Sequence, residues 1–266
     1  MLVYRSGMNV STQTLTFLTQ KLRAHRQAGR TRWRVLSSHQ QALMVLAHLR
    51  KGETYRDLAV GFGVGTTTAY RYLREALTVL AALAPSLEEA MRVAAAKAYV
   101  TLDGTLLRID RVAMASKRDR PYFSGKHKAH GVNVQVIADP AGRLIWASPA
   151  LPGARHDAGA AREHAIPEAL AAVGVTAFAD SAYCGVGTTI RAPYRRTRYD
   201  RTTRKFTCTE LSAGQKAVNQ AHSAIRAPGE RANAELKNWR ILRKIRSSPA
   251  HTTVLINAIQ SLILKS

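Results

Sequence analysis

Cysteine is scarce, and long apolar runs are absent. The chain has 2 cysteines in 266 residues, Cys184 and Cys208, too few and too far apart for a disulfide framework or a zinc knuckle. No run of about 18 apolar residues predicts a membrane span, and the first residues do not resemble a signal peptide. We therefore expect two reduced thiols in a cytoplasmic protein that does not enter a membrane.

Acidic residues are also few. There are 17 Asp and Glu against 40 Lys and Arg, which gives a formal charge of +23. Such an excess of positive charge is stabilised by polyanions, so nucleic acid is the expected partner, although an anionic membrane surface would attract the same charge. With 46% apolar residues, the chain is long enough to bury a substantial core.

The first part of the chain has the pattern of three short helices. Helical spacing of apolar residues begins at Ser38 and ends at Lys51-Gly52, a second helix is predicted over Tyr55–Phe62, and Thr66 or Thr67 can cap a third. The turn before the third helix fits a DNA-reading helix-turn-helix, and a plain three-helix bundle is the alternative. The residues of the third helix that suit phosphates and base edges are Thr66, Thr67, Thr68, Tyr70, Arg71 and Arg74.

A different pattern follows an Ala-rich connector, Ala81–Ala98. We place a domain boundary near residue 90, with a helix-turn-helix domain over 1–90 and a second domain over 91–266. The second domain is predicted as α/β, in the order β-β-β-α-β-α. The elements are strands at Tyr99–Ile109, His130–Asp139 and Arg143–Ala150, a helix at Asp157–Val173, a strand at Val175–Asp180, and a basic helix at Lys216–Leu242 broken at Ala227–Gly229.

Between the last strand and the last helix lies a basic segment, Ile190–Lys205. It contains six arginines and one lysine, and its one acid is Asp200. We interpret it as a loop that contacts phosphates, and a disordered, solvated run of charge is the alternative.

Three acids stand where their neighbours predict burial or a helix. Asp103 interrupts an apolar strand, Asp180 ends another, and Glu230 begins the last part of the basic helix. A buried carboxylate needs a partner. Each could be structural, through a salt bridge, a turn or a solvated helix face, but together they could form an oxygen cage for Mg²⁺ of the kind that serves phosphodiester chemistry.

The motifs around these acids are similar to those of a known family. DGT at 103–105, SGKHKAHGVNVQVIAD at 124–139, PGARHD at 152–157, ADSAYCG at 179–185, and Arg226, Glu230 and Lys237 in R-x3-E-x6-K together resemble a DDE-type insertion-sequence transposase. The bacterial group related to Harbinger-like transposases is the most similar. The resemblance extends from about residue 38 to 242.

The resemblance implies a fold and a set of site residues. It implies an RNase H-like mixed sheet flanked by helices, with Asp103, Asp180 and Glu230 as a catalytic triad that holds two Mg²⁺ or Mn²⁺ ions. Arg226 and Lys237 would touch the DNA of the transposon ends. One departure is Ser223, because many relatives carry Tyr at this position.

Four further residues complete the predicted site. We expect Lys126 and Lys128 of the second motif to bind DNA. Asp157 is either an N-cap that accepts backbone N–H bonds or an additional metal ligand. His156 is interpreted as a local hydrogen-bonding group and not as a base.

The predicted function is therefore DNA transposition. The protein would bind terminal inverted repeats in double-stranded DNA, cleave them and join the freed 3′-hydroxyl to target DNA, as a homodimer or larger assembly in the bacterial nucleoid. The alternatives are a catalytically inactive repressor derived from a mobile element and a structure-selective nuclease.

Overall fold

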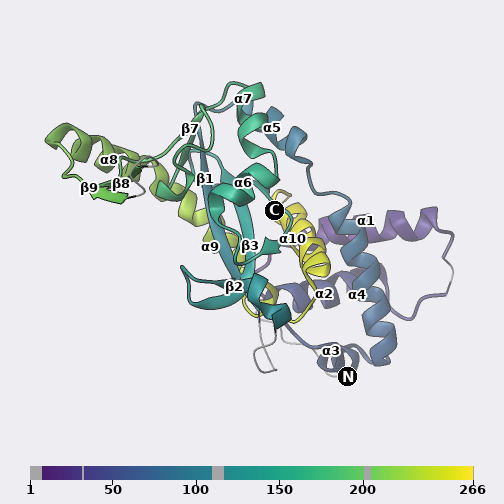
Figure 1. The fold of residues 1–266 in the computed structure, drawn as a ribbon. Helices are drawn as coiled ribbons and strands as arrows, with labels where there is room; N and C mark the ends of the chain where they lie inside the picture. The colour runs from purple at the N-terminus through teal and green to yellow at the C-terminus, as the bar shows by residue number, and fades with distance from the viewer. Residues whose placement is uncertain (1–7, 32, 110–116, 201–204, 266) are drawn as a thin grey trace.

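The computed structural model describes residues 8–31, 33–109, 117–200 and 205–265. Five helices come first (Figure 1). They are α1 (Thr12–Ala28), α2 (Ser38–Lys51), α3 (Tyr55–Phe62), α4 (Thr66–Ala81) and α5 (Leu87–Ala95). The sequence predicts α2 and α3 with the observed bounds, but it does not predict α1.

The ends of these helices follow from local sequence. Ser37 and Thr54 accept backbone N–H bonds as N-caps of α2 and α3, and Gly52 and Gly63 end these helices in the left-handed region at φ 73° and 65°. The predicted Thr cap of α4 is wrong. Gly65 is the N-cap there, without a side-chain bond, because the helix already includes Thr66.

A mixed sheet forms the second part of the molecule. Its strand order is β2-β3-β1-β6-β7, and β4 and β5 also pair with β3. β1 is antiparallel to β3 and parallel to β6. The strands are β1 (Val100–Arg108), β2 (Phe123–Ser124), β3 (Ala129–Ala138), β4 (Leu144–Ala147), β5 (Leu151–Pro152), β6 (Ala177–Ala179) and β7 (Ile190–Arg191).

The helices of this part are shorter than predicted. The expected helix Asp157–Val173 is two helices, α6 (Asp157–Glu163) and α7 (Ile166–Ala172), because Ala165 adopts a left-handed conformation before Pro167. The expected basic helix is α8 (Ala213–Arg226), the 3₁₀ turn η3 (Ala227–Gly229) and α9 (Glu230–Asn238). The remaining elements are the 3₁₀ turns η1 (Lys117–Tyr122), η2 (Ser181–Tyr183) and η4 (Arg240–Leu242), and α10 (Pro249–Ile263).

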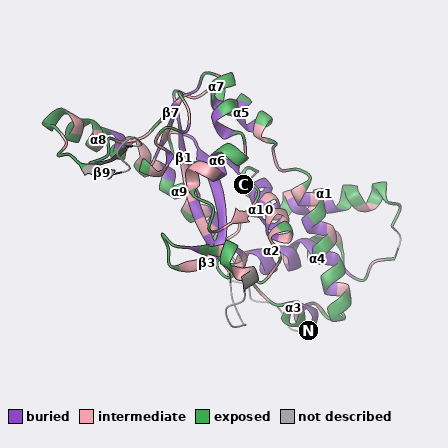
Figure 2. Ribbon diagram, in the orientation of Figure 1, coloured by how far each residue is buried: buried purple, intermediate pink, exposed green. Residues whose placement is uncertain are grey.

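The basic segment Ile190–Lys205 is not a simple loop. Its first residues form β7, and the hairpin β8 (Thr197–Asp200) and β9 (Lys205–Cys208) follows. Residues 201–204 lie outside the described part. The hairpin and α8 extend away from the sheet (Figure 1), and of α8 only His222 is buried (Figure 2).

Two groups of buried side chains hold the molecule together. One packs α5 and α7 against one face of the sheet. The other joins α1–α4, α9 and α10 to the opposite face, so that α10 lies next to α4 in Figure 1. The division at residue 90 remains a prediction, although this second group crosses it.

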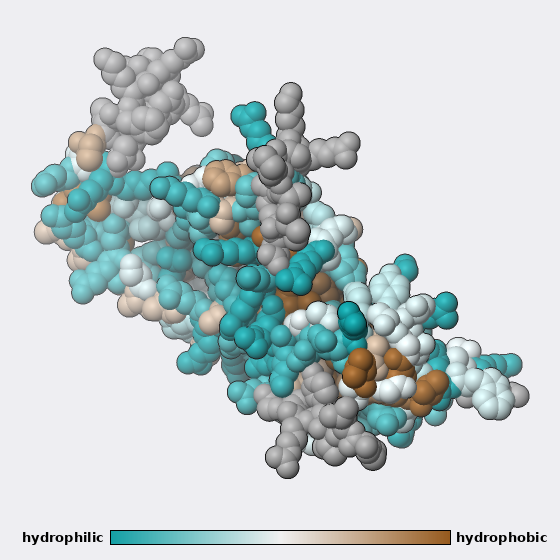
Figure 3. All heavy atoms as spheres, turned by 90° about the horizontal axis from the view of Figure 1, so that it is seen from below, coloured by the Kyte–Doolittle hydropathy of each residue, from teal (hydrophilic) through white to brown (hydrophobic). Residues whose placement is uncertain are grey.

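The surface is polar over much of its area. The face seen from below in Figure 3 is mainly hydrophilic, with few apolar patches. Of the helices that the structure describes, none combines the length and the hydropathy needed to cross a bilayer.

Candidate active site

Strand register brings the first two predicted acids together. β1 and β6 are parallel, and Val100, Thr101 and Leu102 lie opposite Ala177, Phe178 and Ala179. The next residues along the two strands are Asp103 and Asp180. The pairing between β1 and β6 ends before Asp103 and Asp180. From Asp103 onward, the edge of β1 that faces β6 is therefore open, and the two carboxylates are neighbours there.

Each of these carboxylates has its own partners. Asp180 is the N-cap of η2, and its Oδ1 accepts the N–H of Ala182 at 2.7 Å. The Oδ2 of Asp103 accepts from Asn233 Nδ2 at 2.7 Å, and Arg226 Nη2 lies 3.6 Å from Asp103 Oδ1. Asp103 is therefore held by the end of α8 and by α9.

Asp157 is a third carboxylate of this site. It is the first residue of α6, and His156 is the N-cap, so the proposed N-cap role of Asp157 is wrong. Its Oδ1 accepts from Asn133 Nδ2 at 2.8 Å, and its Oδ2 lies 3.3 Å from Lys126 Nζ. Its side chain points into the site and not to the backbone of its own helix.

Lys126 joins two of the acids. Its Nζ lies 3.3 Å from Asp157 Oδ2 and 3.7 Å from Asp180 Oδ2. Partial burial works to lower the pKa of Lys126, but these carboxylates outweigh it and raise the pKa. The sequence predicts Lys126 as a DNA contact. In this structure its ammonium group neutralises the acids.

A chain of buried hydrogen bonds holds the side chain of Asp157. Tyr183 donates to Gln135 Oε1 at 2.6 Å, Gln135 Nε2 donates to Asn133 Oδ1 at 2.7 Å, and Asn133 donates to Asp157. Burial raises the pKa of Tyr183 well above its usual value, and the three acids raise it further, so it stays a neutral donor. The chain fixes the position of Asp157.

Gly104 provides the space for this arrangement. A Cβ atom at Gly104 would overlap the Asp157 carboxylate and would lie 3.1 Å from Gln135 Nε2. The glycine of the DGT motif therefore lets an acid from α6 lie against β1.

The charge on Asp103 is poorly stabilised by its surroundings. Burial raises its pKa, the guanidinium of Arg226 opposes this, and the nearby carboxylates of Asp180 and Asp157 raise the pKa further. A carboxyl group with this kind of perturbation in a cleft is typical of a functional site.

Glu230, the third predicted triad residue, is exposed, and within the described part of the chain it has no hydrogen-bond or ion-pair partner. It lies four residues after Arg226 and three before Asn233, both of which contact Asp103. Residues at this spacing share one helix face. Within α9, Glu230 therefore lies on the same side as Asn233, the side that faces Asp103, without a contact of its own to the acids.

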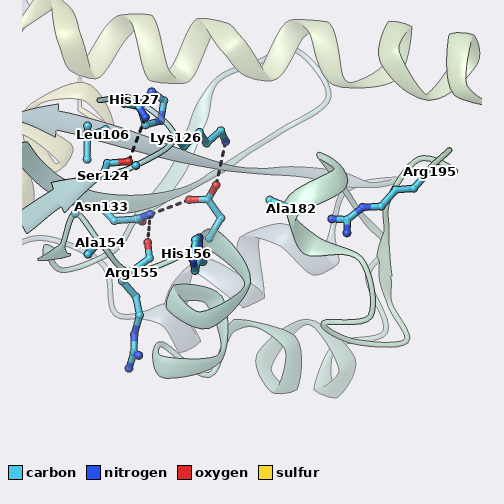
Figure 4. A pocket seen from close by; sticks show the side chains of 13 residues that line it. Leu106, Ser124, Lys126, His127, Asn133, Ala154, Arg155, His156, Ala182 and Arg195 are labelled. Atoms are coloured by element: carbon cyan, nitrogen blue, oxygen red, sulfur yellow. Dashed lines mark hydrogen bonds and ion pairs between the residues drawn. The ribbon is translucent and has the colours of Figure 1, made fainter. Parts of the chain in front are cut away.

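A cavity of about 260 Å³ opens beside Asp157, which is one of its lining residues. Figure 4 shows Lys126 and Asn133 directed toward the carboxylate of Asp157, and His156 and Arg195 also line the cavity. His156 is exposed and makes no side-chain cap bond, so it is available to a ligand.

The donor set of this site suits a hard divalent cation. Asp103, Asp157 and Asp180 offer only oxygen atoms, which Mg²⁺ and Mn²⁺ prefer, and a positive group already lies between two of them. Among the described residues, no three Asp, Glu, His or Cys side chains stand close enough to enclose an ion.

Most residues predicted to bind DNA are on the surface. Thr66, Thr67, Tyr70, Arg71 and Arg74 are exposed on α4, and Thr68 is half-buried. Lys128 is exposed, whereas Arg226 is turned to Asp103. Lys237 is half-buried, and this burial lowers its pKa against the influence of Asp103.

Comparisons with known proteins identify the family. The family described as "DDE superfamily endonuclease" matches residues 102–263, and that described as "Helix-turn-helix of DDE superfamily endonuclease" matches residues 34–86. This chain belongs to the DDE superfamily of endonucleases. The resemblance noted from the sequence motifs is thus confirmed, and so is the helix-turn-helix.

A curated relative supports the same family. The "Putative transposase for insertion sequence element IS112" of Streptomyces albus G is 34% identical over 211 residues, which cover 77% of this chain and 71% of the relative. No solved structure matches this DDE-family chain.

Sequence reasoning missed several residues of the site. Asn133 and Gln135 alternate with valines in β3, and both are buried. Two buried polar residues on one face of a strand need partners, and this pattern is a signal that they support a site. Asn233 has no comparable signal, because its contact with Asp103 depends on how α9 packs.

Proposed function

We propose that this DDE-family protein is a transposase that binds the terminal inverted repeats of its own element, cleaves the DNA there and transfers the strand to a target. The observation that carries the proposal is the β1–β6 register, which makes Asp103 and Asp180 neighbours at an open strand edge. We also propose that the sheet and its helices are an RNase H-like core.

The proposed catalytic groups are Asp103, Asp180 and Glu230, with Asp157 as a further ligand. Two divalent ions bound by these carboxylates would supply an activated oxygen nucleophile and stabilise the leaving oxygen. Glu230 is included because it shares a face of α9 with Asn233, which contacts Asp103.

Lys126 has a defined part in this proposal. Its ammonium group balances the repulsion between Asp157 and Asp180 while no other cation is bound. A divalent ion would compete with Lys126 for both carboxylates, and the released ammonium group of this cavity-lining residue would be free to contact a DNA phosphate.

The DNA would be held by three surfaces. The exposed residues of α4 suit the major groove, as in other helix-turn-helix proteins. Arg195, which lines the cavity, and Lys237 on α9 would contact phosphates near the acids. Because two ends must be processed, we propose that two or more copies assemble on DNA.

The proposal is tested by DNA cleavage. A plasmid carrying the DNA that flanks the gene is incubated with the protein and Mg²⁺ or Mn²⁺, and nicking and joining are followed on gels. We expect Asp103→Asn, Asp180→Asn and Glu230→Gln each to lower cleavage by at least about a hundredfold, since each removes charge stabilisation at the reacting phosphate.

Glu168→Gln is the matched control for Glu230→Gln. Both glutamates are exposed and lie in the first turn of a helix, but Glu168 belongs to α7. Cleavage that persists in all three active-site variants would rule out this site. A wild type that binds the ends tightly but neither cleaves nor joins them with either metal would favour the repressor.

A further inference from the structure

A second cavity, of about 680 Å³, lies away from the acids. It is formed where the end of α2 and the start of α3 meet the segment from η4 to α10. Two parts of the chain about 200 residues apart in sequence therefore build it, since His48 lies on one side and His251 on the other. Nothing in the proposed cleavage reaction uses this groove.

The groove has a strongly positive lining. Its charged basic residues are Lys51, Arg240, Arg243, Lys244 and Arg246, and His48 and His251 also line it. Glu53 is the one acid among the lining residues. The backbone carbonyl of Glu53 accepts a hydrogen bond from the ring of His48 at 2.7 Å. The backbone of Glu53, and not its carboxylate, therefore holds the loop between α2 and α3 in place.

The two sides of the groove are held together by specific contacts. The guanidinium of Arg50 lies 5.0 Å from the ring centroid of Trp239, which is buried, and this contact joins the end of α2 to η4. Gly52 faces the backbone of Arg240, since a Cβ there would lie 3.8 Å from it. The groove is therefore a fixed feature of the fold.

The groove continues into the DNA-reading face of α4. The rings of Tyr55, which lines the groove, and Tyr70, which is exposed on α4, meet edge to face at 5.5 Å. Burial lowers the pKa of His251, and the charge of Arg74 on α4 lowers it further, so these two groups are within electrostatic range.

The groove is linked to the acid site through Lys237 of α9. Arg243 Nε donates to the backbone carbonyl of Lys237 at 2.7 Å. The side chain of Lys237 is in turn within electrostatic range of Asp103. A line of basic groups thus connects α4, through the groove, with the candidate active site.

We propose that this groove binds the phosphate backbone of the DNA duplex that passes from α4 to the acid site. The proposal rests on the proposed function, because it takes the same DNA as ligand. Phosphates are the groups that a row of arginine and lysine side chains recognises, and a duplex is long enough to touch both the groove and α4 at once. The groove fixes where the helix-turn-helix delivers the cleavage point.

The test measures how binding depends on salt. Binding of a fluorescein-labelled 30-base-pair duplex of arbitrary sequence is followed by anisotropy between 50 and 200 mM salt. Arg240→Gln/Lys244→Gln removes two exposed charges of the groove. At a slope of about −0.9 for each phosphate contact, we expect the salt-dependent fall in affinity to be roughly tenfold smaller than in the wild type.

Two controls make the result specific. Lys97→Gln/Lys265→Gln removes the same charge outside the groove, and it should leave the salt slope unchanged within about 0.5. Lys244→Gln alone should change the salt slope by about half as much as the double variant. This single variant replaces the double variant in the test if the double variant unfolds. Thermal unfolding shows whether each variant is folded.

The outcomes separate this inference from the proposed function. A folded double variant with the slope of the wild type overturns the groove proposal but leaves the transposase proposal intact. A wild type that shows no salt-dependent binding of duplex overturns both. Micromolar binding of sodium tripolyphosphate that the double variant loses, with an unchanged duplex slope, would make the groove a small-anion site.

Discussion

The negative charges of Asp103, Asp157 and Asp180 repel one another. Groups from several different elements offset this repulsion. Arg226 and Asn233 come from α8 and α9, Asn133 from β3, and Lys126 from the segment between β2 and β3. The site is therefore intact only when all of these elements are in place. Single residues that hold these elements together should therefore affect the geometry of the site.

Gly104 is the position where this dependence is most direct. Gly104→Ala should displace the Asp157 carboxylate, because the added methyl group would overlap it. We expect nicking to fall at least tenfold and the free energy of unfolding to fall by about 1–3 kcal/mol, the usual cost of overpacking. Nicking assays and urea unfolding measure the two effects.

Gly125→Ala is the matched control. Gly125 lines the same cavity, but a Cβ there has no atom within 4 Å. Both activity and stability should stay close to those of the wild type. If Gly104→Ala cleaves DNA as well as Gly125→Ala does, the position of Asp157 is unimportant for the reaction.

The residues that could be predicted from sequence are those whose chemistry conflicts with their local pattern. Asp103 and Asp180 stand out because apolar strands surround them. Asn233 and Lys126 do not stand out, because a polar residue on a helix or loop is ordinary. Their contacts with the acids arise from tertiary packing, which the sequence pattern does not encode.

At the scale of elements, the turn η3 determines the position of α9. A Cβ at Gly229 would overlap Thr101 of β1, and one at Gly142 would overlap the carbonyl of Pro228. Close backbone contact at both glycines presses the turn against the sheet. Arg226 and Asn233, on either side of the turn, are thereby brought to Asp103.

One of the two helix breaks was predicted from the sequence, and the other was not. The break at Ala227–Gly229 was expected from its Pro-Gly pair, and the structure has it. The break between α6 and α7 was missed because alanine favours helix on both sides, although Pro167 is typical of the first turn of a new helix. Hairpin β8–β9 was missed because its charged sequence lacks apolar alternation.

The turn between β3 and β4 depends on Asp139. Burial works to raise the pKa of this residue, but the N–H groups of Arg143 and Ala141 and the Arg143 guanidinium outweigh it and lower the pKa. A lowered native pKa stabilises the fold above the unfolded pKa of about 3.9, and this contribution is lost as the pH falls further.

Asp139→Asn should therefore cost about 2 kcal/mol at pH 7, a typical value for hydrogen bonds to a charged group. The difference between wild type and variant should be constant above about pH 5 and should shrink below about pH 4. Urea unfolding at several pH values measures it. Glu88→Gln, at an exposed ion pair with Arg92, should change stability by less than about 0.5 kcal/mol. A difference that does not depend on pH would contradict the role of the charge.

At the scale of the whole molecule, α10 ties the helical part to the sheet. Ser261 Oγ donates to the carbonyl of Leu80 in α4 at 2.9 Å, and Gln260 Oε1 accepts the N–H of Ala147 in β4. Thr253 Oγ1 accepts the N–H of Ala150 at 3.0 Å. Through these bonds α10 connects α4 to the sheet that carries the acid site, as the proposed DNA path requires.

Ile259→Ala tests this connection. Ile259 is fully buried on α10 in the group of side chains shared by α1–α4 and the sheet. Removing its side chain should cost about 2–4 kcal/mol. Because the core is shared, helix content measured by circular dichroism and the fluorescence of the tryptophans, among them buried Trp146 of β4, should change together in one transition.

Leu264→Ala is the control for this experiment, because Leu264 is 38% exposed at the end of the same helix. Its stability should change by less than about 1 kcal/mol. Two separate transitions in Ile259→Ala, one in helix content and one in Trp fluorescence, would mean that the helical part and the sheet unfold independently. The groove would then join two bodies that move relative to each other, and the DNA path proposed for it would lose its fixed geometry.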